Sequence, residues 1–572
     1  MDWKPKRTLE ECNKILASPG STHELETRVI DGRVQRVYKN LWPSLRAFWL
    51  SSCHEHGINT YVVYGSQRYT FLQVMERAEK AAYVFRTVYG VKKGDRIAIC
   101  SRNYPEYLVA FWACHLIGAV SVLINAWLPQ DGLLFCITYT QSKVLILDPE
   151  RAEVLKPVIQ ELSKHGVHAI LVLESQTKMW AGMSSWNSVL EDCKGDTGSI
   201  LREAIEIVPE DNATIYFTSG TTGRPKGVLS TQRQYLTNVL NAAAAGLRAT
   251  LRRGEDIKSP EPGPQKGILI STLLELLVMQ SMVATFLGLK IVLMWSWKPR
   301  EAIRLIKAEN IVMAGGVPSM VADLMEIGGF PLETLTFGGA PASKMLPAKV
   351  KSVIANASVS QGYGATETNS VAVSVAGEDQ LLRPTSCGLP TLVNDLMIVE
   401  PTSLVVLSPG QVGEVWIRGI NVMQGYWRDP GMILFSSFSQ DTFNRSYRVE
   451  ATDKAITKDG WFRTGDLGYL DEEGFLYIKD RLKDIIIRGG ENIDSVTVEN
   501  ALYEEPGVQE AAAVGVPDPR LGELVAAVVS VRPNSANRLT EDSLIELARK
   551  RLPRFSVPAM VIILKEELGR GS

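Results

Sequence analysis

Short apolar runs alternate with longer amphipathic segments over most of the chain. The longer segments Tyr107–Ile117 and Thr231–Ala245 have apolar residues at helical spacing. Runs typical of buried strands occur at Ile97–Cys100, Val120–Ile124, Val144–Leu147, Ala169–Leu173 and Thr214–Thr218. This alternation predicts an α/β fold whose sheets are mostly parallel and covered by helices on both faces.

The pattern changes twice towards the C-terminus. A β-rich stretch extends from Val412–Ile417 to Phe475–Ile478, and after Asp480–Asp484 a smaller pattern begins. In it we expect helices at Val496–Tyr503 and Glu541–Arg551 and strands at Ala511–Val516 and Val525–Val531. We therefore predict a large domain over residues 1–480, a hinge at 481–483 and a small, mobile α+β domain over 484–572.

Composition excludes several classes of protein. The 572 residues include 45% hydrophobic and 22% charged residues, with a net charge of -2, so no strong field exists to hold nucleic acid or an anionic membrane. The segment Leu276–Leu289 is the most apolar, but it is shorter than the roughly 20 residues of a membrane span, which favours a buried helix. We expect no integral membrane segment.

The seven cysteines are dispersed and contain no C-x-x-C pair, which indicates free thiols in a reducing compartment. The polar start of the chain lacks the apolar core of a signal peptide. We expect an intracellular protein. The six histidines all precede residue 214 and show no metal-ligand spacing, so we interpret them as structural or surface residues.

The segment Thr214–Val228, TIYFTSGTTGRPKGV, carries the clearest chemistry. A strand enters a loop whose glycines let backbone N–H groups converge on an anion, while hydroxyls and one lysine add donors and charge. Its candidate phosphate-binding residues are Thr218, Ser219, Gly220, Thr221, Thr222, Gly223 and Lys226. The lysine precedes Gly227, unlike the order in the nucleoside triphosphatase P-loop. The alternative is a plain glycine-rich turn.

Further motifs follow in order along nearly the whole chain, and together with TSGTTGRPKG they resemble those of the adenylate-forming superfamily of acyl-CoA synthetases, luciferases and adenylation domains. The matching segments are Gly338–Pro341, Gln361–Glu367, Gly413–Tyr426, Trp461–Asp466 and Asp480–Ile493. The opening segment and FSVPAMVI at 555–562 most resemble fungal acyl-CoA ligases of secondary-metabolite clusters, including host-selective toxin pathways.

The resemblance implies a fold and a set of ligands. The fold is a large N-terminal domain of stacked sheets with a β-rich subdomain, followed by a small mobile domain. The implied cofactors are ATP, Mg²⁺ and coenzyme A, and the partner is a small carboxylic acid. The implied reaction joins the acid to AMP with release of pyrophosphate, after which the sulfur of coenzyme A displaces AMP.

Roles for individual residues follow from the same resemblance. Lys226, Thr366, Glu367 and Lys483 would be catalytic, with Glu367 holding Mg²⁺ and Lys483 serving as the pivot between domains. Asp466 would accept both ribose hydroxyls, and Arg481 would reach the ribose or phosphates, or else pair with Asp480 or Asp484. Further nucleotide or coenzyme A contacts would come from Gly339, Ala340, Pro341, Gln361, Gly362, Tyr363, Gly364, Gly489 and Gly490.

The chain departs from the family pattern in two places. The segment Ile268–Ser281, ILISTLLELLVMQS, replaces a Pro-Leu-Phe-His-like acyl-pocket segment and places Glu275 in an apolar run, where it either faces solvent or lies in a differently folded region. The final residues, Lys565–Ser572, hold Arg570 but not the family's Gly-Lys motif, so we expect weakened adenylation.

Two other functions remain open: a nucleotide-binding paralogue of low turnover, and a free-standing adenylation module that loads a carrier protein. The sequence contains no carrier domain after the small domain, so such a partner would be separate. The last three residues differ from a Ser-Lys-Leu-type signal, and we expect either the cytoplasm or, by resemblance alone, the peroxisome.

Overall fold

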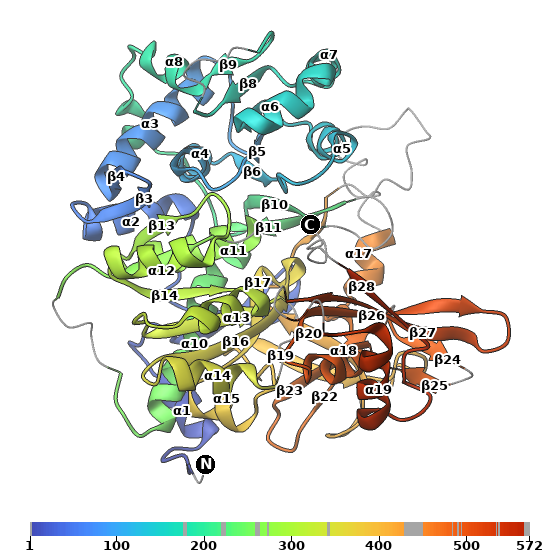
Figure 1. Ribbon diagram of the computed structural model, residues 1–572. Helices are drawn as coiled ribbons and strands as arrows, with labels where there is room; N and C mark the ends of the chain where they lie inside the picture. The colour runs from blue at the N-terminus through green and yellow to red at the C-terminus, as the bar shows by residue number, and fades with distance from the viewer. Residues whose placement is uncertain are drawn as a thin grey trace.

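The computed structural model describes most of the chain. The described residues are 3–174, 180–218, 225–257, 263–271, 274–339, 344–427, 450–482, 484–488, 491–493, 495–532, 535 and 538–564. An α/β N-terminal domain holds two large sheets and a β-rich part, and a small α+β domain follows it, as the sequence predicts (Figure 1).

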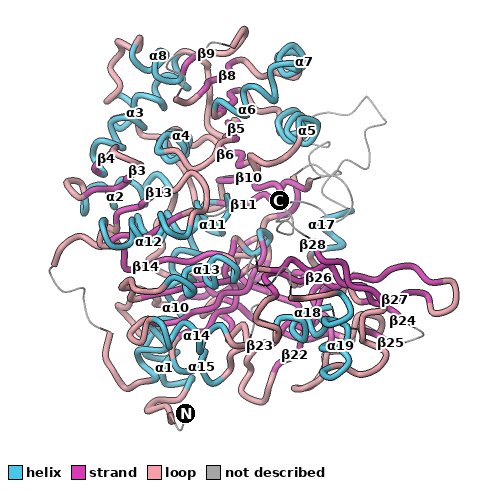
Figure 2. The backbone as a smooth tube through the Cα atoms, in the orientation of Figure 1, coloured by secondary structure: helices cyan, strands magenta, loops and turns pink. Residues whose placement is uncertain are grey.

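The first large sheet has the strand order β21-β11-β10-β6-β5-β7-β8-β9 within the described residues. Strands β5 to β10 are parallel to one another, and β11 and β21 add antiparallel pairs at one edge. Helices cover both faces, with α3 and α4 on one side and α5 to α7 on the other (Figure 2). The strands are β5 (Arg96–Cys100), β6 (Val120–Leu123), β7 (Val144–Leu147), β8 (Ala169–Val172), β9 (Ser184–Ser185), β10 (Asn212–Thr218), β11 (Lys226–Thr231) and β21 (Gly425–Tyr426). The helices are α3 (Phe71–Thr87), α4 (Pro105–Leu116), α5 (Gln130–Thr140), α6 (Pro149–Leu155), α7 (Ile159–Lys164), α8 (Trp186–Glu191) and α9 (Ser199–Arg202).

The second large sheet has the order β18-β17-β16-β15-β14-β12-β13-β3-β4 within the same residues. Its central strands are parallel, and antiparallel strands form both edges. The strands are β3 (Thr60–Tyr64), β4 (Gln67–Thr70), β12 (Gly267–Ile270), β13 (Lys290–Leu293), β14 (Ile311–Gly316), β15 (Thr334–Gly338), β16 (Ser358–Ala365), β17 (Ser370–Ala376) and β18 (Leu389–Pro390). The helices nearby are α2 (Leu45–His56), α10 (Gln232–Arg252), α11 (Leu274–Phe286), α12 (Pro299–Ala308), α13 (Pro318–Ile327), α14 (Leu346–Val353) and α15 (Glu378–Leu382).

One apolar core joins the two large sheets. It contains Ile97 and Ile146 from the first sheet, Ile268 and Ile291 from the second, and residues of α2, α3, α4, α10 and α11. Within it the rings of Trp49 and Trp112 stack, with centroids 4.4 Å apart. Because both sheets pack on the same helices, their strand ends are held in a fixed relation to each other.

The remaining elements form three smaller units. The first residues form α1 (Leu9–Leu16) and the hairpin β1 (Leu25–Ile30) and β2 (Arg33–Tyr38). The β-rich part is a four-stranded sheet of β19 (Asn394–Val399), β20 (Gly413–Gly419), β22 (Phe462–Leu470) and β23 (Leu476–Arg481), with α17 (Glu450–Ala455) nearby. The small domain contains β24 (Ile486–Arg488), β25 (Glu491–Ile493), α18 (Ser495–Tyr503), β26 (Val508–Asp518), β27 (Gly522–Val531), α19 (Glu541–Arg551) and β28 (Met560–Leu564).

Most predicted elements are confirmed to within a few residues. Helix α10 is the main difference, because it continues to Arg252 and not merely to Ala245. Arg248 and Arg252 are polar in sequence but buried in the structure, where they donate to Asn13 and Asp379, while Arg248 Nη1 has no partner among the described residues. The apolar segment at 276–289 forms α11 followed by β13, as expected, and no helix in the described part of the chain is both long and apolar enough to cross a bilayer.

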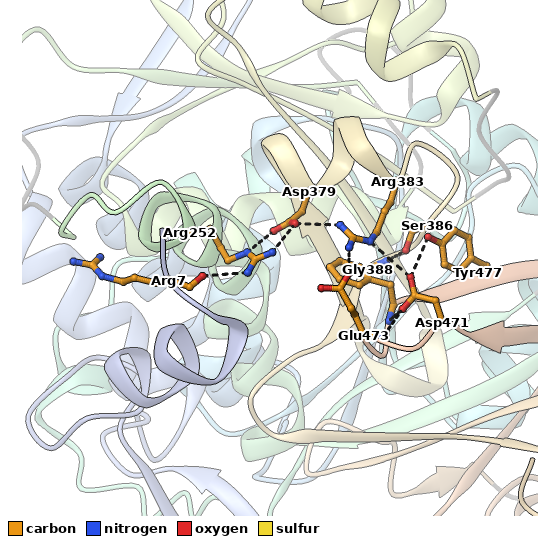
Figure 3. Close-up of polar contacts among 10 residues, drawn as sticks. Arg7, Arg252, Asp379, Arg383, Ser386, Gly388, Asp471, Glu473 and Tyr477 are labelled. Atoms are coloured by element: carbon orange, nitrogen blue, oxygen red, sulfur yellow. Dashed lines mark hydrogen bonds and ion pairs between the residues drawn. The ribbon is translucent and has the colours of Figure 1, made fainter. Parts of the chain in front are cut away.

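An ionic network, of which the Arg252–Asp379 pair is buried, joins α10 and α15 to the turn between β22 and β23 of the four-stranded sheet (Figure 3). Both carboxylate oxygens of Asp379 accept from Arg252, at 3.0 Å each, and one of them also accepts from Arg383. Arg383 in turn pairs with Glu473 and lies 3.7 Å from Asp471, on the turn between β22 and β23. The network therefore fixes the position of the strands that carry Asp466 and Arg481.

Candidate nucleotide site

Two strands hold the ends of the predicted phosphate loop. Strands β10 and β11 pair in antiparallel register, so that Thr218 lies opposite Lys226. The Thr218 hydroxyl donates to the Lys226 carbonyl at 3.5 Å. The predicted loop residues Ser219, Gly220, Thr221, Thr222 and Gly223 lie outside the described residues. The hairpin fixes the position at which Lys226 leaves the sheet.

Lys226 and Glu367 share one tyrosine. The Lys226 ammonium group lies 4.9 Å from the centroid of the Tyr426 ring. The Tyr426 hydroxyl donates to Glu367 Oε1 at 2.7 Å. Burial, followed by the nearby Glu367 carboxylate, raises the pKa of Tyr426, so its hydroxyl keeps the proton that it donates. The cation and the carboxylate predicted for phosphate and Mg²⁺ therefore lie on one small cluster.

Backbone pairing explains why Tyr426 is in place. Strand β21 pairs with β11, with Tyr426 opposite Val228. The Met423 N–H donates to the Glu367 carbonyl at 2.7 Å, which attaches the end of the mid-chain motif to the turn η2 (Thr366–Thr368). Asn421 adds a second link, because its side chain donates to the Thr368 carbonyl at 2.8 Å.

Asp466 forms a second cluster with Tyr363 and Arg481. The Tyr363 hydroxyl donates to Asp466 Oδ2 at 2.6 Å, and Arg481 Nε lies 3.3 Å from Oδ1. Asp466 and Arg481 are direct cross-strand neighbours on β22 and β23. Arg481 therefore pairs with Asp466, and among the described residues the alternative ion pair with Asp480 or Asp484 is not seen. Asp480 instead accepts from the backbone N–H groups of Arg481 and Ser495.

Burial shifts the pKa values in this cluster upward. Loss of solvent raises the pKa of Asp466, while the hydrogen bond from Tyr363 and the charge of Arg481 oppose that rise. Burial and the Asp466 carboxylate raise the pKa of the Tyr363 hydroxyl. The cluster thus presents one carboxylate between a neutral hydroxyl donor and a cation, an arrangement suited to accepting vicinal hydroxyl groups.

The glycines of these motifs allow close approach of backbones. A Cβ on Gly338 would lie 2.6 Å from the Gly362 carbonyl oxygen on the neighbouring strand. A Cβ on Gly364 would overlap the Ser370 carbonyl, so this glycine is required by the packing of β16 on β17. Gly339 has φ of +76°, a conformation that favours glycine, with open space around it. A Cβ on Gly362 would meet only the Val371 side chain, at 3.4 Å.

The structure uses the Gln361 side chain within the protein interior and places Thr366 at the start of a turn. The Gln361 side chain is buried, donates to the Cys387 sulfur at 3.8 Å and accepts from Gln380 at 3.3 Å. Because its amide is bonded within the protein interior, only its backbone is available to a nucleotide. Thr366 opens the turn η2, and its carbonyl accepts from the Asn369 N–H. Ala340, Pro341, Lys483, Gly489 and Gly490 lie outside the described residues.

The altered segment at 268–281 forms the end of β12 and the start of α11. Met279 and Met282 of this helix are buried in the core between the large sheets. The Glu275 side chain is outside the described set, as are residues 565–572, which include Lys565 and Arg570. The first departure therefore concerns a segment that still forms a helix, and the second lies outside the described residues.

The residues present fit a hard cation that arrives with phosphates. The described part of the chain contains no group of three or more His, Cys, Asp or Glu residues arranged to hold a metal by themselves. Mg²⁺ in nucleotide sites commonly uses one or two carboxylates together with phosphate oxygens and water. A single carboxylate at Glu367 beside Lys226 agrees with that pattern. All seven cysteines are unpaired, as expected.

Sequence reasoning missed Tyr426 and Asp480 as parts of this region. Tyr426 closes the segment GEVWIRGINVMQGY, which resembles a family motif, yet nothing in its spacing reveals that its hydroxyl would meet a residue of another motif. Asp480 is buried and holds Ser495 of the small domain through both the N–H and the hydroxyl, at 2.6 and 3.1 Å.

Comparison with known proteins supports the family resemblance seen in the sequence. Residues 51–427 match the model of the AMP-binding enzymes, and residues 497–570 match that of the AMP-binding enzyme C-terminal domain. The chain is 31% identical over 504 residues to a long-chain-fatty-acid–CoA ligase of Mycobacterium tuberculosis, covering 86% of this chain and 89% of that protein. It is 30% identical to a feruloyl-CoA synthase of Amycolatopsis sp, covering 88% and 91% of the two chains. The structure resembles an O-succinylbenzoate coenzyme A synthetase from Bacillus subtilis in complex with ATP and magnesium ion, with a TM-score of 0.72, 25% identity and coverage of 91% and 96%.

Proposed function

The chain belongs to the family of AMP-binding enzymes and is an acid–thiol ligase that uses ATP, Mg²⁺ and coenzyme A, and we propose that the two clusters described above carry its first half-reaction. In that step a carboxylate oxygen of the acid attacks the α-phosphorus of ATP, and pyrophosphate leaves. In the second step the coenzyme A sulfur attacks the acyl carbon, and AMP leaves.

Lys226 and Glu367 would handle the phosphate charge. The ammonium group of Lys226 would bind β- and γ-phosphate oxygens, and Glu367 would hold Mg²⁺, which neutralises phosphate charge when bound. Thr366 would donate to the α-phosphate. The observation that carries this proposal is Tyr426, which contacts both Lys226 and Glu367 and so fixes the cation and the carboxylate relative to each other.

Asp466 would bind the ribose. Both of its oxygens already have partners, Tyr363 and Arg481, so ribose hydroxyls must share or replace these contacts. Arg481 is the easier to replace, because its side chain is 64% exposed and its Nε lies 3.3 Å away, whereas the Tyr363 bond is 2.6 Å. The ring of Tyr363 would lie beside the adenine, next to the backbone at Gly338 and Gly339.

We propose residues 481–483 as the hinge between domains 1–480 and 484–572, with Lys483 as its pivot. Its flanks are attached on both sides, since the Leu482 N–H donates to the Gly465 carbonyl and the Asp484 N–H to the Arg481 carbonyl. Rotation of the small domain would have to separate Asp480 from Ser495, and also Arg532 from Glu326 and Lys344 from Glu504, which pair across the interface. These contacts would set the cost of changing between the two half-reactions.

We also propose a role in fungal secondary metabolism, including toxin biosynthesis, on the resemblance of the opening segment and residues 555–562. The named relatives act on a fatty acid and on ferulate, which supports an acid with an apolar chain or ring for this protein.

The decisive experiment supplies a panel of carboxylic acids with ATP, Mg²⁺ and coenzyme A, and measures AMP and acyl-CoA by mass spectrometry. We expect AMP and acyl-CoA in equal amounts for at least one acid, and loss of both in Lys226→Ala and Glu367→Gln. The control Lys266→Ala removes a lysine that pairs with Glu333 outside the site. ATP binding without AMP formation for any acid would refute the proposed reaction, and transfer to a carrier protein but not to coenzyme A would replace its second step.

A further inference from the structure

Gln280 on α11 has a buried amide oxygen with no partner. Its Oε1 makes no hydrogen bond with the described residues and is shielded from solvent. Its Nε2 lies over Gly315 of β14, 3.3 Å from the place that a Cβ on this glycine would take. A buried amide oxygen without a partner destabilises the folded state. A glutamine held in such a position suggests a hydrogen-bond donor that arrives with a ligand.

The position of Gly315 connects Gln280 to the candidate nucleotide site. Gly315 pairs with Thr336 on β15, and Thr336 pairs with Ser360 on β16. The hydroxyls of Thr336 and Ser360 lie 2.7 Å apart, so they share one face of the sheet. The row consists of one glycine and two hydroxyl-bearing residues, on a sheet against which α10 and α11 pack.

The next row on the same face is formed by Gly338 and Gly362, because side chains alternate along a strand and both residues are two positions further on. Two residues correspond to about 7 Å along a strand. An acid whose carboxylate lies at these strand ends would therefore extend back along this face towards Gly315 and Gln280.

The backbone of β15 lies close to Gly315, beside Gln280. A Cβ on Gly315 would lie 2.5 Å from the Thr336 carbonyl oxygen, so this position can only be glycine. Gln67 shows that an unpartnered oxygen alone does not define a site, since its Oε1 is also buried without a partner but lies on β4, at the far edge of the same sheet. Gln280 is distinguished by its place beside the row that leads to the nucleotide motifs.

We propose that Gln280 is a specificity-determining residue, whose Oε1 accepts a hydrogen bond from a hydroxyl group on the acyl part of the acid, about 7 Å from its carboxylate. This inference rests on the proposed function and deepens it, because it assigns the substrate to hydroxylated acids and not to plain alkanoic or aryl acids. The Nε2 group remains a donor for a second oxygen in the same place.

The test compares acids that differ only by a hydroxyl group, namely 4-hydroxybenzoate with benzoate, and ω-hydroxyalkanoates with alkanoates of the same length. AMP formation gives kcat/KM for each acid. We expect the wild type to prefer the hydroxylated member of at least one pair by tenfold or more. Gln280→Leu should reduce that preference about 10- to 100-fold, and Gln280→Glu, which keeps an acceptor, should retain it. The control Gln67→Leu removes an equivalent orphan oxygen at the sheet edge and should leave the preference unchanged.

The outcomes separate the two claims. AMP formation with an unchanged preference in Gln280→Leu would refute the inference but leave the proposed reaction intact. An equal loss on both members of every pair, with a lower Tm, would assign Gln280 to the packing of α11 and also overturn the inference. If no acid of any kind gives AMP, the proposed function fails and the inference fails with it.

Discussion

Removing the hydroxyl group of Tyr426 tests the geometry of the phosphate cluster directly. Tyr426→Phe deletes the donor that lies 2.7 Å from Glu367 Oε1 but keeps the ring 4.9 Å from the Lys226 ammonium group. The hydroxyl is neutral and its partner is an ionised carboxylate, and such a bond contributes about 1.5–3 kcal/mol. If that free energy holds Glu367 in place for the transition state, kcat/KM should fall about 10- to 150-fold.

The readout is pyrophosphate release measured over a range of Mg²⁺ concentrations. Because Glu367 is the predicted ligand of Mg²⁺, the variant should need more Mg²⁺ for half-maximal rate, while its Tm should change little. Tyr426→Leu also removes the ring from Lys226 and should lower the rate further, by up to about tenfold.

A matched control exists in Tyr477, whose hydroxyl donates to Asp471 at 3.3 Å outside the site. Tyr477→Phe should leave the Mg²⁺ dependence unchanged. The reasoning is wrong if Tyr426→Phe keeps the wild-type rate and Mg²⁺ requirement, or if it lowers Tm and activity to the same degree as Tyr477→Phe.

Three further predictions follow from the contacts around the site. Gly338→Ala places a Cβ 2.6 Å from the Gly362 carbonyl oxygen and should lower the free energy of unfolding by about 1–3 kcal/mol, measured as a lower Tm. The control Gly246→Ala, on α10 with open space around it, should be neutral or stabilising. In Arg481→Gln the raised pKa of Asp466 should rise further, because the charge of Arg481 opposes that rise in the wild type. The carboxylate must be ionised to accept from ribose, so ATP affinity should begin to fall at a higher pH on acidification than in the wild type. Identical profiles of Kd against pH would contradict this. Asp379→Ala leaves Arg252 buried without its carboxylate and should cost about 3–5 kcal/mol in urea unfolding, whereas Glu301→Ala, which breaks an exposed pair with Arg304, should cost less than about 1 kcal/mol.

The sequence predicts what depends on local periodicity. The buried strands β5 to β8 are apolar at nearly every position, so their existence and parallel arrangement follow from composition and spacing. The end of α10 does not follow in this way, because Arg248 and Arg252 donate hydrogen bonds to Asn13 and Asp379, residues far away in the chain. Helix propensity alone contains no information on such partners.

The candidate site was predictable in its residue types but not in its pairings. The Tyr363–Asp466 bond joins residues 103 positions apart, and Tyr426 meets Glu367 across 59 positions. A motif specifies that a carboxylate or a ring is present, while the register of antiparallel pairs decides which of them meet. The pairing of β11 with β21 places Tyr426 opposite Val228, and neither hydrophobic pattern nor turn chemistry sets that register from the short segment involved.

Alternation along β16 explains how one short motif serves several parts of the reaction. Gln361 and Tyr363 face the four-stranded sheet, where they meet Cys387 and Asp466, so this side of the strand holds the cluster that we propose binds ribose. Ser360 and Gly362 face the opposite side, towards the row that leads to Gln280. After the strand ends, η2 turns the chain so that Glu367 meets Tyr426, whose ring lies beside Lys226 of the first sheet. An insertion or deletion of one residue within 360–364 would exchange the two faces of β16 and leave Glu367 out of register. Such a change should abolish ATP binding and acid selectivity together. A substitution at Gln280 should alter selectivity alone.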